Sequence, residues 1–188
     1  GRITAQLLSE VLGMPDASVV AALVSAIGTG DARSALEHCA ALLEGGTLTA
    51  IRTAATTALA TDALARRDAR RLLIVGTGEE AWYHARALAQ VRAFEVITIW
   101  GRNAAHAQGL SQRLATIALP HAPKLSVATD LSAAVAQACV ICTVTSAKEP
   151  FLRGEWLPAG AHLNLVGSAI PTTAEVDVET VRRGRFFV

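Results

Sequence analysis

The sequence predicts an α/β protein in which a doubly wound parallel sheet follows a helical N-terminal segment. Three observations predict this class. From residue 71 onward, short apolar runs alternate with amphipathic stretches, as in parallel strands joined by helices. The first of these runs breaks at a Gly-x-Gly turn. Before residue 67, apolar residues recur at helical spacing instead. We therefore expect a helical segment over residues 1–67 and an α/β domain over residues 68–188.

The N-terminal segment predicts several helices. Within residues 3–44, leucines and valines recur every three or four positions. Residues 47–65 predict a longer helix, rich in Ala and Thr, which can pack close to a neighbour because its side chains are small. Arg66 and Arg67 at its end suit the negative charge of a helix C-terminus.

Arg52 is an unusual residue in this helix because its neighbours are mostly small. One interpretation is a surface arginine whose charged end reaches solvent. The other is an anion-binding residue in a cleft, since a guanidinium matches a carboxylate with two parallel hydrogen bonds.

The α/β half predicts strands and helices in alternation. Strands are expected at 71–75, 95–100, 125–128, 139–143 and 161–166, with helices near 79–92, 103–117, 131–137 and 176–183. A further strand is expected to begin at 185–188. Each strand–helix–strand unit predicts a right-handed crossover, which places helices on both faces of the sheet.

The turn at Gly76-Thr77-Gly78 predicts a dinucleotide site. A strand precedes it and a helix follows, so backbone N–H groups and the positive helix terminus point at one place. Gly76 makes the tight turn, Gly78 allows phosphates to approach, and Ala81 permits close packing of the helix on the strand. An ordinary glycine turn is the alternative interpretation.

Glu79 and Glu80 lie in the first turn of this helix. Carboxylates there suit the helix dipole, but they compete with phosphate if they face inward. At least one of them is therefore expected to point to solvent.

The end of the second predicted strand indicates which dinucleotide is preferred. NAD sites usually hold a carboxylate there for the ribose 2′-hydroxyl, whereas this chain has Gly101-Arg102-Asn103. A carboxylate repels a 2′-phosphate and an arginine pairs with it, so NADP(H) is expected over NAD(H). Trp100 could flank the adenine or pack in the core. A solvated loop arginine is the alternative interpretation of Arg102.

Composition argues against several classes of function. The 188 residues are 52% hydrophobic with a formal net charge of +1, which favours neither nucleic acid nor a membrane as a partner. No apolar run approaches the ~18 residues of a membrane span. Cys139 and Cys142 are three positions apart on a predicted strand and face opposite sides, so packed thiols are expected rather than a metal site. The cysteine usage and the sequence of residues 1–27 predict a cytoplasmic protein.

Five segments together resemble the ornithine cyclodeaminase/mu-crystallin family. They lie at 47–55, 76–81, 99–103, 143–146 and 156–167, and Glu175 also fits the pattern. The similarity runs over about residues 42–188. It implies a Rossmann-type domain beside a domain for substrate binding and dimerisation. It also implies hydride transfer between a nicotinamide and a small amino or imino acid.

The resemblance assigns roles to individual residues. Arg52 matches the arginine that holds the substrate carboxylate. The expected cofactor-binding residues are Gly76, Thr77, Gly78, Glu79, Glu80 and Ala81 at the phosphates, Gly101, Arg102 and Asn103 at the 2′-phosphate, and Thr143, Val144, Thr145, Val166, Gly167 and Ser168 at the nicotinamide.

The chain also departs from the family pattern. Glu80 stands where the family usually has Gln, and Ala169 stands where cyclodeaminases carry an acid/base aspartate. Residues 1–41 contain no Lys, although the family draws an active-site lysine from its N-terminal domain. The family's substrate and dimerisation domain is therefore expected to be largely absent from this chain.

The favoured function is NAD(P)H-dependent reduction of the C=N bond of a small imino acid, such as a cyclic ketimine or pyrroline-2-carboxylate, with a homodimer expected. Three alternatives remain: a non-catalytic NADPH- or ligand-binding protein, an ornithine cyclodeaminase-type lyase, and a Rossmann domain for S-adenosylmethionine, against which Arg102 argues. The sequence does not identify a proton donor. Lys148, His84 and His162 are candidates, with solvation or packing as the alternative for each.

Overall fold

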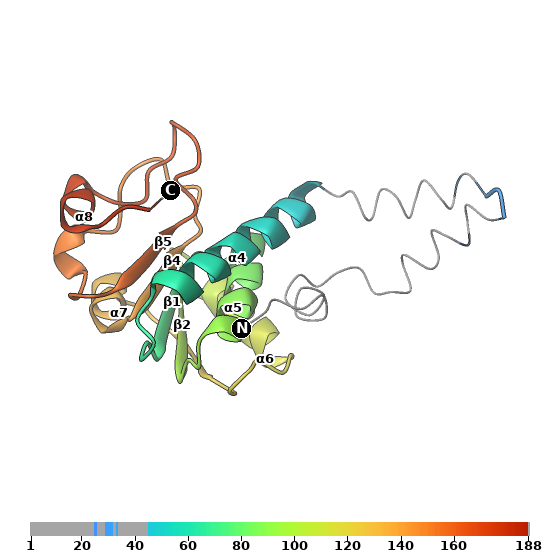
Figure 1. Cartoon of the computed structure of the whole chain (residues 1–188), viewed down its shortest axis with the longest axis horizontal. Coiled ribbons are helices and arrows are strands. Elements are labelled where there is room, and N and C mark those ends of the chain that lie inside the picture. The colour runs from blue at the N-terminus through green and yellow to red at the C-terminus, as the bar shows by residue number, and fades with distance from the viewer. Residues whose placement is uncertain (1–24, 26–28, 32, 34–44, 188) are drawn as a thin grey trace.

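The computed structural model describes residues 25, 29–31, 33 and 45–187 (Figure 1). The helices expected within residues 3–44 lie almost wholly outside the described residues. The elements in chain order are α4 (Gly45–Leu64), β1 (Arg71–Val75), α5 (Glu79–Val91), β2 (Val96–Trp100), α6 (Ala104–Ala115), β3 (Lys124–Val127), α7 (Leu131–Gln137), β4 (Val140–Thr143), the 3₁₀ turn η1 (Gly154–Trp156), β5 (His162–Leu165) and α8 (Val178–Arg183).

The five strands form one parallel sheet in the order β3-β2-β1-β4-β5. This is the Rossmann order, so the predicted α/β fold class is confirmed. The further strand expected from residue 185 is wrong for the described part of the chain. Residues 184–187 run as irregular chain and carry the exposed side chains of Phe186 and Phe187, with no ladder to a neighbouring strand. The division of the chain at residues 67 and 68 stays a prediction.

The sheet is buried because helices cover both of its faces, as in Figure 1. Leu72, Leu73, Ile74 and Val75 of β1 are all fully buried, which explains the continuous apolar run. Leu72 and Ile74 pack toward α5 and α6. Leu73 and Val75 pack toward α7 and η1.

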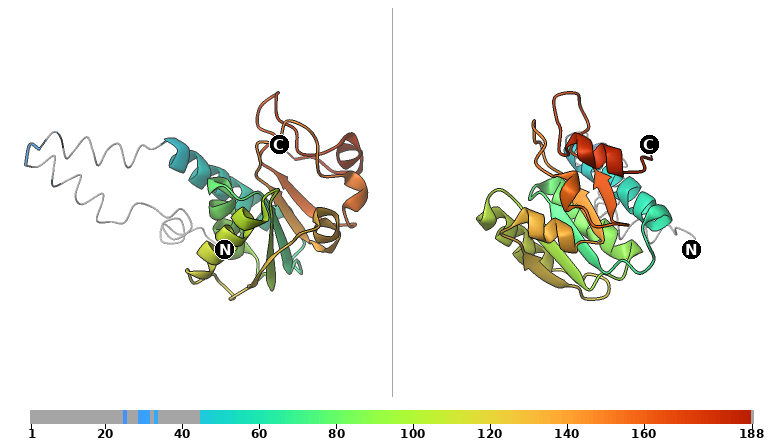
Figure 2. Two further views of the ribbon diagram at one scale, coloured as in Figure 1. Left: turned by 180° about the vertical axis from the view of Figure 1, so that it is seen from behind. Right: turned by 90° about the vertical axis from the view of Figure 1, so that its left-hand side faces the viewer.

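Helix α4 packs beside α5, and the views of Figure 2 show the two helices next to each other. Ala54 and Ala58 of α4 meet Ala87 of α5, and all three are buried. Small side chains at this contact allow the close packing that the composition predicted. A hydrogen bond of 3.0 Å from Asn164 Nδ2 to Thr61 Oγ1 also joins α4 to β5.

The C-terminal end of α4 is capped by an arginine that directly follows another helix, α5. Arg92, directly after α5, is buried, and its Nη2 donates to the carbonyls of Thr61, Asp62 and Ala65 at 3.0, 2.8 and 3.0 Å. We expected Arg66 and Arg67 to serve this helix end. Both lie exposed just after the helix end, and the carbonyls of its last turn accept hydrogen bonds from the buried guanidinium of Arg92.

Candidate functional site

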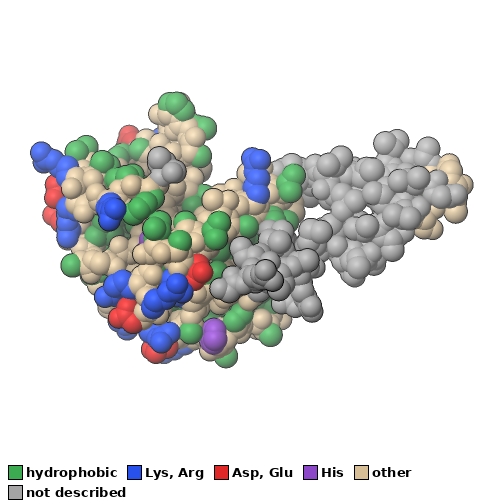
Figure 3. All heavy atoms as spheres, in the orientation of Figure 1, with side chains coloured by type: hydrophobic (Ala, Val, Ile, Leu, Met, Phe, Trp, Pro, Cys, Tyr) green, Lys and Arg blue, Asp and Glu red, His purple; other side chains and the backbone are tan. Residues whose placement is uncertain are grey.

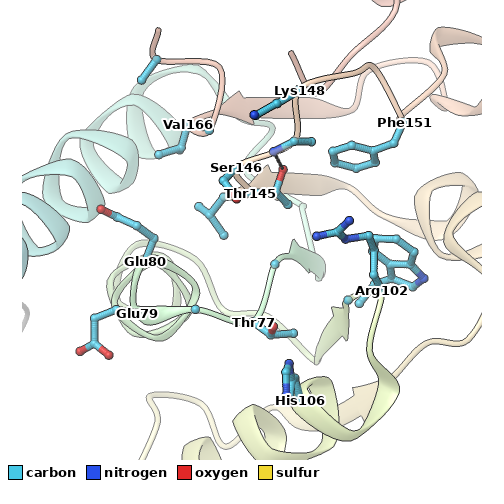
Figure 4. Close-up of a pocket in the computed structure, with 18 of the residues that line it drawn as sticks. Thr77, Glu79, Glu80, Arg102, His106, Thr145, Ser146, Lys148, Phe151 and Val166 are labelled. Carbon is cyan, nitrogen blue, oxygen red and sulfur yellow. Dashed lines mark hydrogen bonds between the residues drawn. The ribbon is translucent and has the colours of Figure 1, made fainter. Parts of the chain in front are cut away.

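An open cleft of about 1420 Å³ lies at the carboxyl ends of the strands (Figure 4). Strand order reverses between β1 and β4, and ligands of doubly wound sheets bind at that reversal. The lining residues are Thr49, Thr53, Gly76, Thr77, Gly78, Glu79, Glu80, Trp100, Gly101, Arg102, Asn103, His106, Val144, Thr145, Ser146, Ala147, Lys148, Glu149, Pro150, Phe151, Val166, Gly167 and Ala169. The volume exceeds that of most small-molecule pockets and suits an extended ligand.

The glycine turn has the shape that an anion site needs. Gly76 has φ +136°, and a Cβ there would lie 2.8 Å from the carbonyl oxygen of Val144. Only glycine allows this turn, which brings the end of β1 against the end of β4. A Cβ on Gly78 would meet nothing within 4 Å, and Gly78 caps α5 without a side-chain hydrogen bond. The first N–H groups of α5 therefore remain for a ligand, as a diphosphate requires.

The two carboxylates of the first turn point in different directions (Figure 4). Glu79 Oε2 lies 3.6 Å from Arg113 Nη1, and the side chains of both residues are about half exposed. Arg113 also lies over the ring of Trp82, 4.0 Å from its centroid. The expectation that one of the pair faces solvent is met by Glu79.

Glu80 faces the cleft without a cationic partner among the described side chains. Its Oε2 is buried, accepts no hydrogen bond, and lies 3.3 Å from His84 Nδ1. His84 Nδ1 is closer, at 2.7 Å, to the carbonyl oxygen of Glu80 itself, so its proton goes there. Burial raises the pKa of the Glu80 carboxyl above its usual value, and the charge on Glu79 raises this pKa further.

His84 is buried behind Glu80 and does not line the cleft. Burial lowers the pKa of its ring, so His84 is neutral near pH 7. With Nδ1 donating to Glu80, Nε2 accepts from Thr57 Oγ1 at 3.2 Å. His162 also lies away from the cleft and contacts Asn164 Oδ1 at 3.1 Å. The geometry therefore supports a packing role for both histidines.

Arg102 directs its guanidinium into the cleft from the end of β2 (Figure 4). It is exposed and makes no hydrogen bond or ion pair within the described part of the chain. Asn103 caps α6 by accepting from Ala105 N at 2.9 Å, and His106 in the first turn of α6 also lines the cleft. Trp100 lines the same end and stacks on Phe151, with ring centroids 6.2 Å apart. This end of the cleft can receive an anion.

The opposite wall consists of the chain after β4 and β5. Val144, Thr145, Val166 and Gly167 line it, whereas Thr143 is buried behind it. Glu175, which is fully buried, holds this wall from behind through its carboxylate.

Four of the predicted site residues do not line the cleft: Arg52, Ala81, Thr143 and Ser168. Ala81 is buried where α5 packs on the sheet, as its packing role requires. Ser168 is exposed and accepts a hydrogen bond from Glu175 N at 3.1 Å. Arg52 is exposed on α4, and the residues of α4 that reach the cleft are Thr49 and Thr53.

Several lining residues were absent from the predicted site. Thr49 and Thr53 lie one helical turn apart on α4, a spacing that marks one face but no particular function. His106 on α6 and Glu149 in the loop after β4 carry no motif, and Ser146 belongs to the family-like segment 143–146 but was given no role of its own. Lys148, considered only as a proton donor, also lines the cleft and is exposed.

The described residues offer no group of three or more His, Cys, Asp or Glu side chains that could bind a metal ion. Cys142 is buried with a pKa raised well above its usual value by burial, and Cys139 is partly buried. Among the helices that the structure describes, none is long and apolar enough to cross a membrane.

Comparison with known protein families identifies the chain. The model of the ornithine cyclodeaminase/mu-crystallin family matches residues 33–188. The chain belongs to the ornithine cyclodeaminase/mu-crystallin family. This agrees with the segments quoted above, which join the glycine turn to Arg102 and to the ends of β4 and β5.

Two relatives of this family illustrate the similarity. The chain is 36% identical over 149 residues to a Delta(1)-pyrroline-2-carboxylate reductase of Colwellia psychrerythraea, covering 79% of this chain and 46% of the relative. It is 34% identical over 148 residues to the ketimine reductase mu-crystallin of Mus musculus, covering 79% and 45%. The chain thus spans less than half the length of these family members.

A solved structure supports the same fold. The Delta(1)-pyrroline-2-carboxylate reductase of Thermococcus litoralis, in complex with NADH and L-proline, superposes with a TM-score of 0.69 at 29% identity. The match covers 74% of this chain and 42% of that one.

Proposed function

We propose that the cleft binds a nicotinamide dinucleotide and that the protein reduces the C=N bond of a small imino acid. The observation that carries this proposal is the convergence of three features at the strand reversal. These are the glycine turn before an uncapped helix α5, the free guanidinium of Arg102, and the wall formed after β4 and β5. The pyrroline-2-carboxylate and ketimine reductases among its relatives support the reaction class.

NADP(H) is the proposed cofactor in preference to NAD(H). Arg102 has no acidic partner among the described residues, and no carboxylate follows β2 directly. His106 lines the same end of the cleft as Arg102.

The chain's own residues bind and orient the reactants, and the bound cofactor supplies the hydride. The first N–H groups of α5 hold the diphosphate, and Arg102 holds the 2′-phosphate. The wall containing Thr145 and Gly167 supports the nicotinamide end. Arg52 is proposed, from the family resemblance, to bind the substrate carboxylate. Orientation and exclusion of water supply the rate enhancement that such a site can give.

A cyclodeaminase reaction is less favoured than reduction. Ala169 lines the cleft at the position where cyclodeaminases have an acid/base aspartate, and a methyl group cannot transfer a proton. The missing acid supports a second candidate function, binding of NADPH without turnover.

One assay separates the reductase from the binding protein. NADPH and a cyclic ketimine or pyrroline-2-carboxylate are mixed with the protein, and absorbance of the reduced nicotinamide is followed. Steady oxidation that depends on both substrate and protein supports reduction. Binding of NADPH in calorimetry without oxidation supports the binding protein.

If the protein is active, Arg52→Ala should raise KM for the imino acid and leave the Kd of the cofactor unchanged. Unchanged kinetics in this variant would show that Arg52 does not contact the substrate.

We also propose a cytoplasmic homodimer whose partners are small molecules. Exposed Leu48, Leu59 and Leu64 on α4 are apolar surface that a second copy could cover. Lys, Arg, Asp and Glu lie intermixed on the face in Figure 3, which offers nucleic acid no basic surface there. Sedimentation equilibrium of the 188-residue chain tests the dimer, and a monomer at all concentrations would contradict it.

A further inference from the structure

Glu175 is a fully buried carboxylate that binds the ends of two strands. Its Oε1 accepts from Thr145 N and Thr145 Oγ1, both at 2.7 Å. Its Oε2 accepts from Thr143 Oγ1 at 2.7 Å and from Gly167 N at 2.9 Å. No Lys, Arg or His of the described chain forms an ion pair with it. A buried charge of this kind is retained only where its hydrogen bonds replace water.

The hydrogen bonds of Glu175 require a carboxylate rather than an amide. Each carboxylate oxygen accepts from one backbone N–H, that of Thr145 on one side and that of Gly167 on the other. A glutamine has one oxygen and one NH₂ group, so in either orientation its NH₂ faces a backbone N–H. One of the two loops would then lose its bond to the side chain.

These bonds fix one wall of the cleft. Thr145 follows β4, Gly167 follows β5, and both line the cleft in front of Glu175. A Cβ on Gly167 would overlap the carbonyl oxygen of Thr145 and lie 2.5 Å from Glu175 Oε1, so the two loops are already as close as backbone allows. The position of each loop therefore depends on the carboxylate between them.

Arg102 follows β2, whereas Thr145 and Gly167 follow β4 and β5, which lie on the other side of β1 in the sheet. A dinucleotide with its diphosphate at α5 and its adenosine ribose at Arg102 places its other half over β4 and β5. We propose that Glu175 is a positioning residue that shapes the nicotinamide end of the cleft and does not contribute to the adenosine end. This inference rests on the proposed cofactor function.

Calorimetric titration of Glu175→Gln with two ligands tests the proposal. NADPH fills both ends of the cleft, whereas 2′-phospho-ADP-ribose lacks the nicotinamide. We expect the Kd for NADPH to rise about tenfold or more, while the Kd for the fragment stays within about twofold. The control Glu179→Gln, at an exposed position on α8, should bind both ligands as wild type does.

Hydrogen exchange of the ligand-free protein gives a readout that does not depend on a cofactor. The amides of Thr145 and Gly167 should exchange faster in Glu175→Gln than in wild type, with exchange in β1 and β2 unchanged. If this variant does not fold, Thr143→Val removes one buried donor and should give the same selective loss of NADPH binding, about threefold.

The outcomes separate the two proposals. Wild-type protein that binds neither ligand refutes the cofactor site, and the role of Glu175 with it. Wild-type binding combined with unchanged NADPH affinity in the variants refutes only the role of Glu175. Equal losses for NADPH and the fragment also refute it, because they indicate general damage rather than a change at the nicotinamide end.

Discussion

Arg92 and Asp62 form an ion pair at the junction of two helices, with 2.5 Å between Arg92 Nη1 and Asp62 Oδ1. The arginine side chain is almost wholly buried, whereas the aspartate is about half exposed. The same guanidinium donates hydrogen bonds to three carbonyl oxygens at the end of α4. It therefore attaches α4 to the sheet domain.

Removing this arginine should destabilise the protein. Arg92→Met leaves the buried carbonyls of α4 without donors, and we expect a loss of about 3 kcal/mol in the free energy of unfolding. Urea denaturation measures it. The control Arg67→Met removes an exposed arginine 3.3 Å from the same Asp62 and should cost no more than ~0.5 kcal/mol. Similar losses in both variants would contradict a capping role for Arg92.

Asp62 makes part of this stability depend on pH. The hydrogen bond from Arg92 is the largest cause of its lowered pKa. A carboxyl whose pKa is lower in the folded state stabilises that state above its unfolded pKa of about 3.9, and this contribution is lost as the pH falls through the folded value. Asp62→Asn should therefore be less stable than wild type near pH 6, and the difference should shrink near pH 3. A constant difference in urea denaturation across this range would exclude ionisation as the cause.

A substitution at Gly76 should destabilise the fold, whereas one at Gly78 should leave its stability unchanged. Gly76→Ala meets the backbone of Val144 at a φ that L-residues rarely adopt, so about 1–3 kcal/mol of stability should be lost. Gly78→Ser meets nothing within 4 Å and supplies an N-cap, so stability should be kept. The serine occupies the N–H groups meant for phosphate, so NADPH binding should fall about tenfold. Thermal unfolding measures the stability of both variants, and calorimetric titration measures their affinity for NADPH. An undiminished NADPH affinity in Gly78→Ser would show that the phosphates do not bind at the start of α5.

Arg102→Asp should discriminate between the two nicotinamide cofactors. Loss of the guanidinium and gain of a carboxylate should weaken NADPH binding by well over ~1.4 kcal/mol, a factor of ten, with NADH affected far less. Fluorescence titration with each cofactor measures this. Arg182→Asp, an exposed substitution on α8, controls for net charge. Equal losses for NADPH and NADH would show that Arg102 does not contact the 2′-phosphate.

Glu80→Gln should strengthen cofactor binding at neutral pH. The carboxylate faces the cleft at the first turn of α5, where its charge repels a diphosphate. Its pKa is raised, so falling pH protonates it and removes the repulsion earlier than for an ordinary glutamate. The affinity of wild type for NADPH should rise toward about pH 5, whereas Glu80→Gln should bind several-fold tighter at about pH 8 and lose that part of the pH dependence.

The pH profile of wild type needs a comparison with the variant, because other ionisable groups lie near the cleft. His106 and Lys148 line the cleft, and Glu79 lies beside Glu80 in the first turn. These groups are common to wild type and Glu80→Gln, so their effect cancels when the two pH profiles are compared. Glu79→Gln, whose carboxylate is near Arg113, should change affinity less. Parallel pH profiles for wild type and Glu80→Gln would contradict the assignment to Glu80.

The fold could be predicted because its signals are local. The β1 run is continuous and apolar since it is buried on both faces, and the glycine turn follows from sterics at Gly76. Arg102 was found for a similar reason, because the end of β2 is a fixed place in a Rossmann domain.

Other features depend on contacts between distant parts of the chain. Arg92 caps a helix about 30 positions earlier, as its bond to Thr61 spans 31 residues. Glu175 bonds to Thr143 over 32 residues. The hydrogen-bond partners of Arg92 and Glu175 cannot be predicted from sequence spacing, because only the fold brings them close. The family resemblance included Glu175 but gave it no role, and it could not show that Thr49 and Thr53, rather than Arg52, line this cleft.

The contact between Gly101 and Thr77 limits which substitutions could change the preference of this protein to the unphosphorylated coenzyme. A Cβ at position 101 would lie 2.5 Å from the Thr77 methyl carbon. An acidic residue introduced there to grip a free ribose hydroxyl would collide with that methyl group. Thr77→Ser removes the obstacle, so coenzyme preference in this chain should be retuned at both positions at once.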